Sequence, residues 1–329
     1  MAATVSARNY TTAPNSTLLH MALPVLVSLV AEPLTGLADT AFVARLGTEA
    51  LASLGIGTMI LTSTFWIFNF LGVGTQTELA KHLGANNTEK ASAVCSASLC
   101  LALGLGILSI LAAWPFLALS ADAMGGHGQI TALAVEYMQA RLFGAPAVLI
   151  TFACFGALRG VQDMKAPLLI AAMVNALNIL LDWLLIFGIG PFPALGVQGA
   201  ALATSASQWG GALWAILLVH RHIGFSRSVR LDDIRRLVSI GGDMFVRTAM
   251  VLAFLLFATR VATEAGAESG AAHQAIYASS FSLPHCFWMR LPSAGRASSV
   301  SFWAATTEQR PGAWQKQYAY GALAPAACS

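Results

Sequence analysis

The sequence predicts an all-α, polytopic helical membrane protein. Of the 329 residues, 57% are hydrophobic and only 10% are charged, and the mean hydropathy is +0.68. Soluble domains carry about 25% charged residues, so a soluble core does not explain this composition. Apolar runs of roughly 20 residues or more, the length that crosses a bilayer, recur between short polar loops. Because backbone groups in lipid must be hydrogen-bonded within their own segment, such runs are expected to be helices.

Seven apolar runs are expected to span the membrane. The first follows a helix cap at Asn15-Ser-Thr17 and contains Pro24 and Pro33, breakers that membrane helices tolerate beside a cavity. The second is rich in glycine, which allows neighbouring helices to approach closely. An eighth apolar run begins at Ala271. The expected spans are residues 18–43, 51–79, 91–119, 131–158, 167–191, 197–219 and 237–261.

The loops alternate in their content of Lys and Arg. The odd loops hold only Arg45 and Arg260, whereas the even loops hold Lys81, Lys90, Arg159, Lys165, Arg221, Arg227, Arg230, Arg235 and Arg236. Short loops rich in Lys and Arg stay in the cytoplasm. The sequence therefore predicts a multi-pass protein of the inner (plasma) membrane with a cytoplasmic N-terminus.

A short internal repeat suggests two equivalent halves. Gly47, Glu49 and Ala52 after the first span match Gly266, Glu268 and Ala271 after the seventh. Transporters are often built from such repeats. The expected segments are a cytoplasmic segment 1–17, a six-helix lobe 18–219, a basic cytoplasmic linker 220–236, the start of a second lobe 237–280 and an atypical tail 281–329.

The tail 281–329 differs in character from the rest of the chain. It is rich in Ser, Arg, Pro and Trp and contains no apolar run of 18 residues. We therefore expect a truncated chain, with a tail that could be read in the wrong frame. The alternative is a natural short tail.

The fifth span carries the polar residues that best indicate function. Asn175, Asn178 and Asp182 are spaced i, i+3, i+7 and so share one helical face, opposite Leu, Ile, Val and Ala. A carboxylate at the middle of a bilayer costs roughly 2.5 to 3.5 kcal/mol even on the mildest scale. This face is expected to line a path or a site inside the protein. The alternative is a polar contact that holds two helices together.

Further polar side chains lie in the first two spans. Glu32 and Asp39 are seven residues apart and share a helical face. Asp39 is near the outer end of its span, so a solvated carboxylate is the alternative there. Gln76 lies in the later part of the second span.

Several other classes of protein are disfavoured. None of the five cysteines forms a C-x-x-C pair, which argues against a zinc site or a disulfide framework, and no basic run suggests nucleic acid. A retinal pigment needs a Schiff-base lysine in its last helix, and residues 237–261 contain none. No span holds a His-x-x-x-His motif, a paired Glu motif or a Ser–His pair, so the chain is not expected to be an enzyme.

Several stretches spread over residues 17–276 carry a resemblance to a known family. They are MALPVLVSLVAEPLTGLADTAFVARLGTEALASLGIG, GVGTQTELAKHLGANN, YMQARLFGAPA, LRGVQDMKAP, NALNILLDWLLIFG, GGDMFVRT and AAHQA. Jointly they resemble the multidrug and toxic compound extrusion (MATE) family, in the bacterial branch named for the DNA-damage-inducible protein F. The resemblance implies two six-helix lobes around a central cavity. It also implies export of organic, often cationic, compounds in exchange for H+ or Na+.

The resemblance also implies roles for individual residues. The ion-coupling site of the first lobe is implied to be Asp39, Asn178, Asp182 and Thr204, and Glu32, Asn175 and Gln76 are candidates to line the cavity. Asp39 and Asp182 could share a proton, since neighbouring buried carboxyl groups resist joint ionisation. Protonation would then change the bending of the first span at Pro24 and Pro33. Na+ is the one metal ion that this site could hold, and no cofactor beyond H+ or Na+ is expected. Gln76, Arg141, Arg159 and Asp163 also match family motifs and are interpreted as packing and loop residues.

Alternatives to a drug antiporter stay open. One is a lipid-linked sugar flippase of the same superfamily, which would favour several cationic residues in the cavity, where only Arg141 and Arg247 lie well inside spans. Another is a seven-helix membrane protein that transports nothing. The family's twelve helices exceed the seven expected here, so the antiporter could be inactive, or a second chain could complete the cavity. The expected partners are small organic substrates and the bilayer.

Overall fold

The computed structural model describes residues 36–226 and 231–242, together with Val246, Met250 and Phe254. The described part is helical and contains no strand, which confirms the predicted all-α class. The predicted cap at Asn15-Ser-Thr17, the breakers Pro24 and Pro33, the acid Glu32 and the tail lie outside the described residues.

The helices follow one another with short connections. Residues 36–43 are helical and lead into η1 (Ala44–Leu46), and a further helix covers residues 231–242. The helices between them are α3 (Thr48–Ile67), α4 (Phe70–Gly84), α5 (Thr88–Ala113), η2 (Trp114–Phe116), α6 (Leu117–Ala123), α7 (Gln129–Leu142), α8 (Ala145–Gly160), α9 (Lys165–Phe187) and α10 (Gly196–His222).

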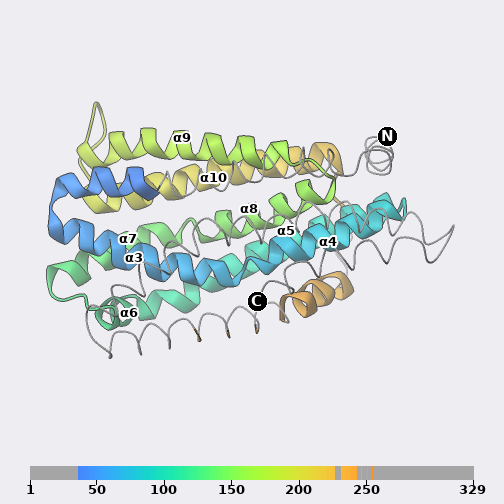
Figure 1. Cartoon of the computed structure of the whole chain (residues 1–329), viewed down its shortest axis with the longest axis horizontal. Coiled ribbons are helices and arrows are strands. Elements are labelled where there is room, and N and C mark those ends of the chain that lie inside the picture. Colours follow the sequence, from blue (N-terminus) through green and yellow to red (C-terminus); the bar gives the residue numbers. More distant parts are fainter. Residues whose placement is uncertain (1–35, 227–230, 243–245, 247–249, 251–253, 255–329) are drawn as a thin grey trace, which may run out of the picture.

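The long helices lie side by side along the long axis of the molecule (Figure 1). Four stretches within the described residues are long and apolar enough to cross a membrane: Thr48–Gly84, Thr88–Ala123, Lys165–Phe187 and Gly196–His222. The pair α7 and α8, bent by 48° at its break, makes a fifth. These stretches coincide with the second to sixth predicted spans. The second span is broken between α3 and α4, a break that the hydropathy pattern did not predict.

Local sequence explains several helix ends. The side chain of Asn87 accepts a hydrogen bond from the Lys90 backbone N–H at 3.0 Å and so caps α5. Gly188 follows α9 in the left-handed region, with φ of 69°, a conformation that glycine adopts without steric cost. Pro115 lies in η2, where α5 ends.

Glycine allows the helices of the lobe to touch at their backbones. A Cβ on Gly156 of α8 would overlap the Gly72 carbonyl oxygen of α4, and one on Gly199 of α10 would lie 2.6 Å from the Leu185 oxygen of α9. Such close crossings are how membrane helices gain packing energy when burial of apolar surface between them gives little. The glycines therefore fix which helices lie together.

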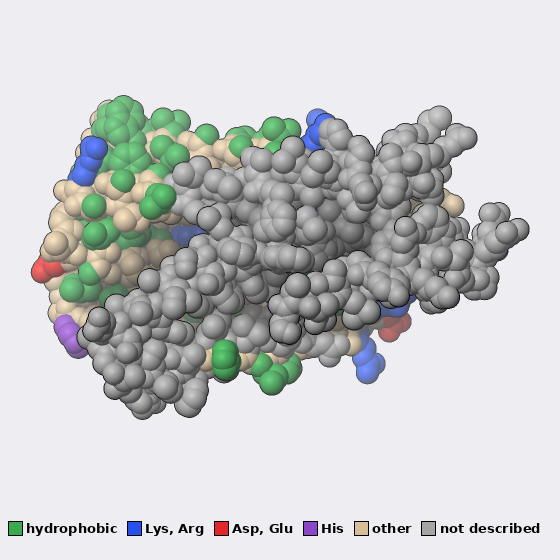
Figure 2. Space-filling view, viewed as in Figure 1, with side chains coloured by type: hydrophobic (Ala, Val, Ile, Leu, Met, Phe, Trp, Pro, Cys, Tyr) green, Lys and Arg blue, Asp and Glu red, His purple; other side chains and the backbone are tan. Residues whose placement is uncertain are grey.

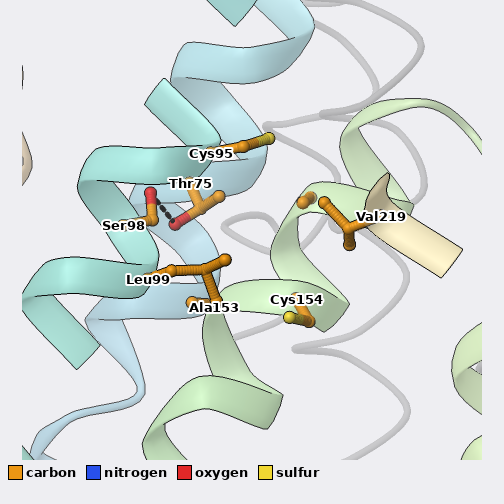
Figure 3. Close-up of a pocket in the computed structure, with 8 residues that line it drawn as sticks. Thr75, Cys95, Ser98, Leu99, Ala153, Cys154 and Val219 are labelled. Atoms are coloured by element: carbon orange, nitrogen blue, oxygen red, sulfur yellow. Dashed lines mark hydrogen bonds between the residues drawn. The ribbon is translucent and has the colours of Figure 1, made fainter. Parts of the chain in front are cut away.

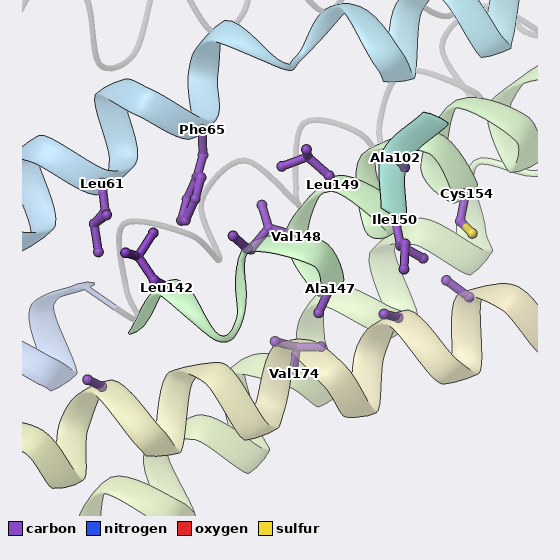
Figure 4. Packing of buried hydrophobic residues seen from close by; sticks show 14 of the residues in the cluster. Leu61, Phe65, Ala102, Leu142, Ala147, Val148, Leu149, Ile150, Cys154 and Val174 are labelled. Atoms are coloured by element: carbon purple, nitrogen blue, oxygen red, sulfur yellow. The ribbon is translucent and has the colours of Figure 1, made fainter. Parts of the chain in front are cut away.

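The core lies between these helices and the outward side chains are apolar. Leu61 and Phe65 of α3 point towards Leu142 and Val148 across the core (Figure 4). Exposed large apolar side chains include those of Leu111 and Trp183. On the visible face of the described part, most charged side chains lie towards the two ends of the long axis (Figure 2). This distribution suits a bundle surrounded by lipid along its length.

Candidate functional site

The polar face of α9 points into the lobe. Asn178 is 1% exposed and Asp182 is 0% exposed, whereas Trp183 on the other side is 47% exposed. Asn175, on the same stripe, is half-buried. The helix α9 packs against α10, and Asn178 contacts Thr204 of that helix. The sequence prediction that this face is internal is therefore correct for Asn178 and Asp182.

The carboxyl groups of Asp39 and Asp182 lie within hydrogen-bonding reach of each other. Asp39 comes from the helix of residues 36–43, and Asp182 from α9. Ionised carboxylates only accept hydrogen bonds. Among the described residues, Oδ1 of Asp39 and both oxygens of Asp182 accordingly have no hydrogen-bond partner. One proton placed between the two groups would turn them into a donor and an acceptor, so the arrangement is suited to holding a cation.

Asn178 and Thr204 form a second polar contact one helical turn from Asp182. The Asn178 Nδ2 atom donates to Thr204 Oγ1 at 3.3 Å, and Thr204 Oγ1 donates to the Ala200 carbonyl oxygen of its own helix at 2.8 Å. Asn178 Oδ1 has no partner among the described residues. Because the Asn178 amide nitrogen is bonded to Thr204, the Asn178 amide oxygen remains available on the face that also carries Asp182.

Arg141 of α7 adds a positive charge to this cluster. It attracts the Asp39 carboxylate electrostatically, and its guanidinium carbon lies 5.6 Å from the centre of the Phe65 ring. Its Nη1 atom has no hydrogen-bond partner among the described residues. On the preceding turn, the Tyr137 hydroxyl lies 3.2 Å from Thr58 Oγ1.

The sequence interpretation of Arg141 as a packing residue missed this placement. The residue does pack, through its cation–π contact with Phe65, but it also lies beside Asp39. A charged residue deep in an apolar span is by default a functional candidate. That signal could have drawn attention to Arg141 before its neighbours were known.

The sequence of this chain matches that of known transport proteins. A profile of the MatE family matches residues 24–184. The Escherichia coli protein named DNA damage-inducible protein F is 30% identical over 250 residues, which cover 74% of this chain and 54% of that protein. The Shewanella oneidensis protein named FAD transporter is 34% identical over 215 residues, which cover 62% and 46% of the two chains. Residues 24–184 form a MatE-family domain.

Solved structures agree with this MATE assignment. A structure described as that of a MOP superfamily transporter from Pyrococcus furiosus superposes with a TM-score of 0.76 at 25% identity, covering 88% of this chain and 64% of that one. MATE proteins are transporters and not enzymes. The chain spans about half the length of the two relatives above, 54% and 46%.

The remaining predicted residues lie elsewhere or outside the described part of this chain. Gln76 is 2% exposed on α4, the helix that crosses α8. Glu32 lies outside the described residues. That Glu32, Asn175 and Gln76 line a cavity stays a prediction.

A small pocket lies between α4, α5, α8 and α10 (Figure 3). Its empty volume is about 150 Å³, and Thr75 Oγ1 donates to Ser98 Oγ at 2.9 Å on its wall. The buried thiols of Cys95 and Cys154 line it as well. None of the predicted ion-coupling residues lines this pocket, and the described residues contain no group of three or more His, Cys, Asp or Glu that could hold a metal ion.

Proposed function

We propose that this chain works in a secondary active transporter that exports organic, often cationic, compounds in exchange for H+ or Na+. The observation that carries the proposal is the carboxyl pair of buried Asp182 and half-buried Asp39, in which both Asp182 oxygens and Oδ1 of Asp39 have no hydrogen-bond partner among the described residues. The MatE-family match over residues 24–184 supports the same conclusion. Ionisable residues inside a membrane typically mark ion pathways and proton relays.

The charges at the site suit a single monovalent cation. With both acids ionised, Arg141 leaves one excess negative charge in the cluster. One H+ between the carboxyl groups, or one Na+ among the oxygens of Asp39, Asp182, Asn178 and Thr204, would neutralise it. Oxygen ligands of this kind suit hard cations. Binding of the ion and of the exported compound would then be linked, because each changes the free energy of the other's binding.

The proposed location is the inner membrane, with the N-terminus in the cytoplasm. The basic residues support this orientation, because they gather where α4, α8 and α10 end and where α5 and α9 begin: Lys81, Lys90, Arg159, Lys165 and Arg221. Short basic loops remain in the cytoplasm. The substrate cavity of a two-lobed transporter would be completed by a second lobe, from this chain or from a second one.

The substitution Asp39→Asn tests the proposed coupling. Asparagine keeps the shape of the side chain but cannot bind or release a proton, so we expect efflux of a fluorescent organic cation to lose its dependence on an imposed ion gradient. The measurement uses the full chain in proteoliposomes with a pH or Na+ gradient. The matched control is Asp122→Asn, an exposed acid that accepts a hydrogen bond from Thr131 at 2.8 Å outside this cluster. Gradient-driven efflux that survives in Asp39→Asn would refute the proposal.

The substitution Thr204→Val distinguishes Na+ from H+ as the coupling ion. Valine keeps the volume of threonine but removes Oγ1, which would be a ligand of Na+ and not of a proton between the acids. We expect Na+ affinity to fall about tenfold, equivalent to about 1.4 kcal/mol, with coupling to H+ unchanged. The readout is 22Na+ binding beside pH-driven efflux. Thr64→Val is the control, since the Thr64 hydroxyl bonds only to its own helix among the contacts described, at 2.8 Å from Ile60 O.

A further inference from the structure

The helix of residues 231–242, orange in Figure 1, packs against α4. A Cβ on Gly241 would lie 2.5 Å from Cδ2 of the Phe70 ring, and a Cβ on Gly74 would lie 3.5 Å from Cδ2 of Leu237. Arg236 Nε lies 3.1 Å from Glu78 Oε2. Residue numbers rise along α4 through these three contacts and fall along the other helix, so the two helices run antiparallel.

The contact has an apolar part and a charged end. Phe70, Gly74 and Glu78 follow one another at intervals of four residues and so form one stripe of α4. Leu237, 2% exposed, and Gly241 form the matching stripe of the other helix. The apolar residues make up most of the contact between the two helices. The ion pair lies at the end of α4 where the basic loops gather.

The Glu78 carboxylate is more buried than the acidic group of a typical surface ion pair. Its side chain is only 7% exposed, whereas that of Arg236 is 52% exposed. A buried carboxylate without a partner is strongly destabilising. Within the described part of the chain, a second basic side chain lies near the same oxygen, because His82 Nε2 is 3.8 Å from Glu78 Oε2 on the next turn of α4. Glu78 therefore has one partner on its own helix and one on the helix that packs against it.

We propose that Glu78 is an electrostatic latch that holds the helix of residues 231–242 on α4 through Arg236 and lets that helix move away when the ion pair breaks. The inference rests on the proposed transport function, in which the parts of the protein separate on one side of the membrane at a time. The helix 231–242 follows α10 and joins the end of the predicted linker to the start of the predicted second lobe, so its release would open the basic side.

The latch is tested by the distance between the helix of residues 231–242 and the first turn of α5, the helix that directly follows α4. Nitroxide labels at Glu89→Cys and Val238→Cys, on exposed positions of a cysteine-free chain in nanodiscs, report by pulsed electron resonance the ratio of docked to released molecules. We expect Arg236→Gln and Glu78→Gln each to lower this ratio at least threefold, and the double variant to lower it no further. Exchange of the two charges, Glu78→Arg with Arg236→Glu, is expected to restore docking.

The matched control is Arg235→Gln, an exposed arginine of the same helix that makes no described ion pair with Glu78. The proposal is overturned if Arg236→Gln gives the same ratio as Arg235→Gln, or if the effects of the two single variants add in the double variant. The charge exchange separates loss of the latch from misfolding, since a misfolded variant would not regain the docked distance. The labels report docking without substrate or ion gradient. Failure of this test therefore leaves the result with Asp39→Asn untouched, and the reverse holds as well.

Discussion

Replacing Asp182 by asparagine is expected to abolish ion-coupled export and to raise the melting temperature of the protein. Asp182 is 0% exposed, and neither of its carboxyl oxygens has a hydrogen-bond partner among the described residues. A buried charge of this kind destabilises the fold, and replacement of buried ionic groups is often stabilising by about 1–4 kcal/mol. Asparagine has the same shape, carries no charge and can donate a hydrogen bond to Asp39. We therefore expect a melting temperature a few degrees higher, since about 1 kcal/mol shifts the melting temperature by about 2–4 °C in proteins of roughly 150–250 residues.

Both effects can be measured on one preparation. Gradient-driven efflux from proteoliposomes reports coupling, and thermal unfolding in detergent at fixed pH reports stability. Asp122→Asn again serves as the control, because it makes the same chemical change at an exposed site. A variant that is less stable than the parent would mean that the Asp182 carboxylate contributes to the fold. If export by the variant still depended on the ion gradient, Asp182 would not be part of the ion site.

The second large effect is expected from Gly156→Ala, which should prevent α4 and α8 from packing. The added methyl group would overlap the Gly72 carbonyl oxygen and lie 2.9 Å from both the carbonyl carbon and Cα of Gly72. All three are backbone atoms, so no side chain can rotate to make room. Overpacking a tight core costs about 1–3 kcal/mol and occasionally more. Because a helix backbone has to move here, we expect at least the upper end of that range.

Gly104→Ala on α5 is the matched control for this substitution. A Cβ on Gly104 would have no atom within 4 Å, and alanine is the better helix former by about 0.5–1 kcal/mol. Thermal unfolding and the yield of monodisperse protein should therefore drop for Gly156→Ala and hold or rise for Gly104→Ala. Equal stability of the two variants would show that the α4–α8 crossing is looser than described.

Much of the fold follows from the sequence, because apolar length and polar spacing are local properties. Runs of apolar residues predicted the helices, and the spacing of Asn178 and Asp182 predicted that both point inward. The same spacing placed Asn175 with them, yet Asn175 is only half-buried. Burial along one stripe depends on what packs against each turn, and a helical period does not specify that.

The contacts between distant residues could not be predicted in this way. Arg141 and Asp39 belong to helices whose pairing depends on the close crossings of the glycines, and no local pattern encodes which glycine meets which helix. The ion pair of Glu78 and Arg236 could not be predicted either. In the sequence, Glu78 lies in a predicted span and Arg236 in a basic loop, and nothing local links the two. The family resemblance supplied the grouping of Asp39, Asn178, Asp182 and Thr204, which spacing alone did not.

The breaks in two of the helical spans divide the lobe into two tiers across the membrane. One break separates α3 from α4 and the other separates α7 from α8, and the pieces pack as α3 with α7 and α4 with α8. Arg141 and Tyr137 of the ion cluster lie in the first tier, and Glu78 lies in the second. The unbroken helix α10 contacts both α7 and α8 over its 27 residues. If α10 moves as a rigid body, a displacement at the ion site can therefore reach the end of the lobe where the basic residues gather. Neither tier would have to repack.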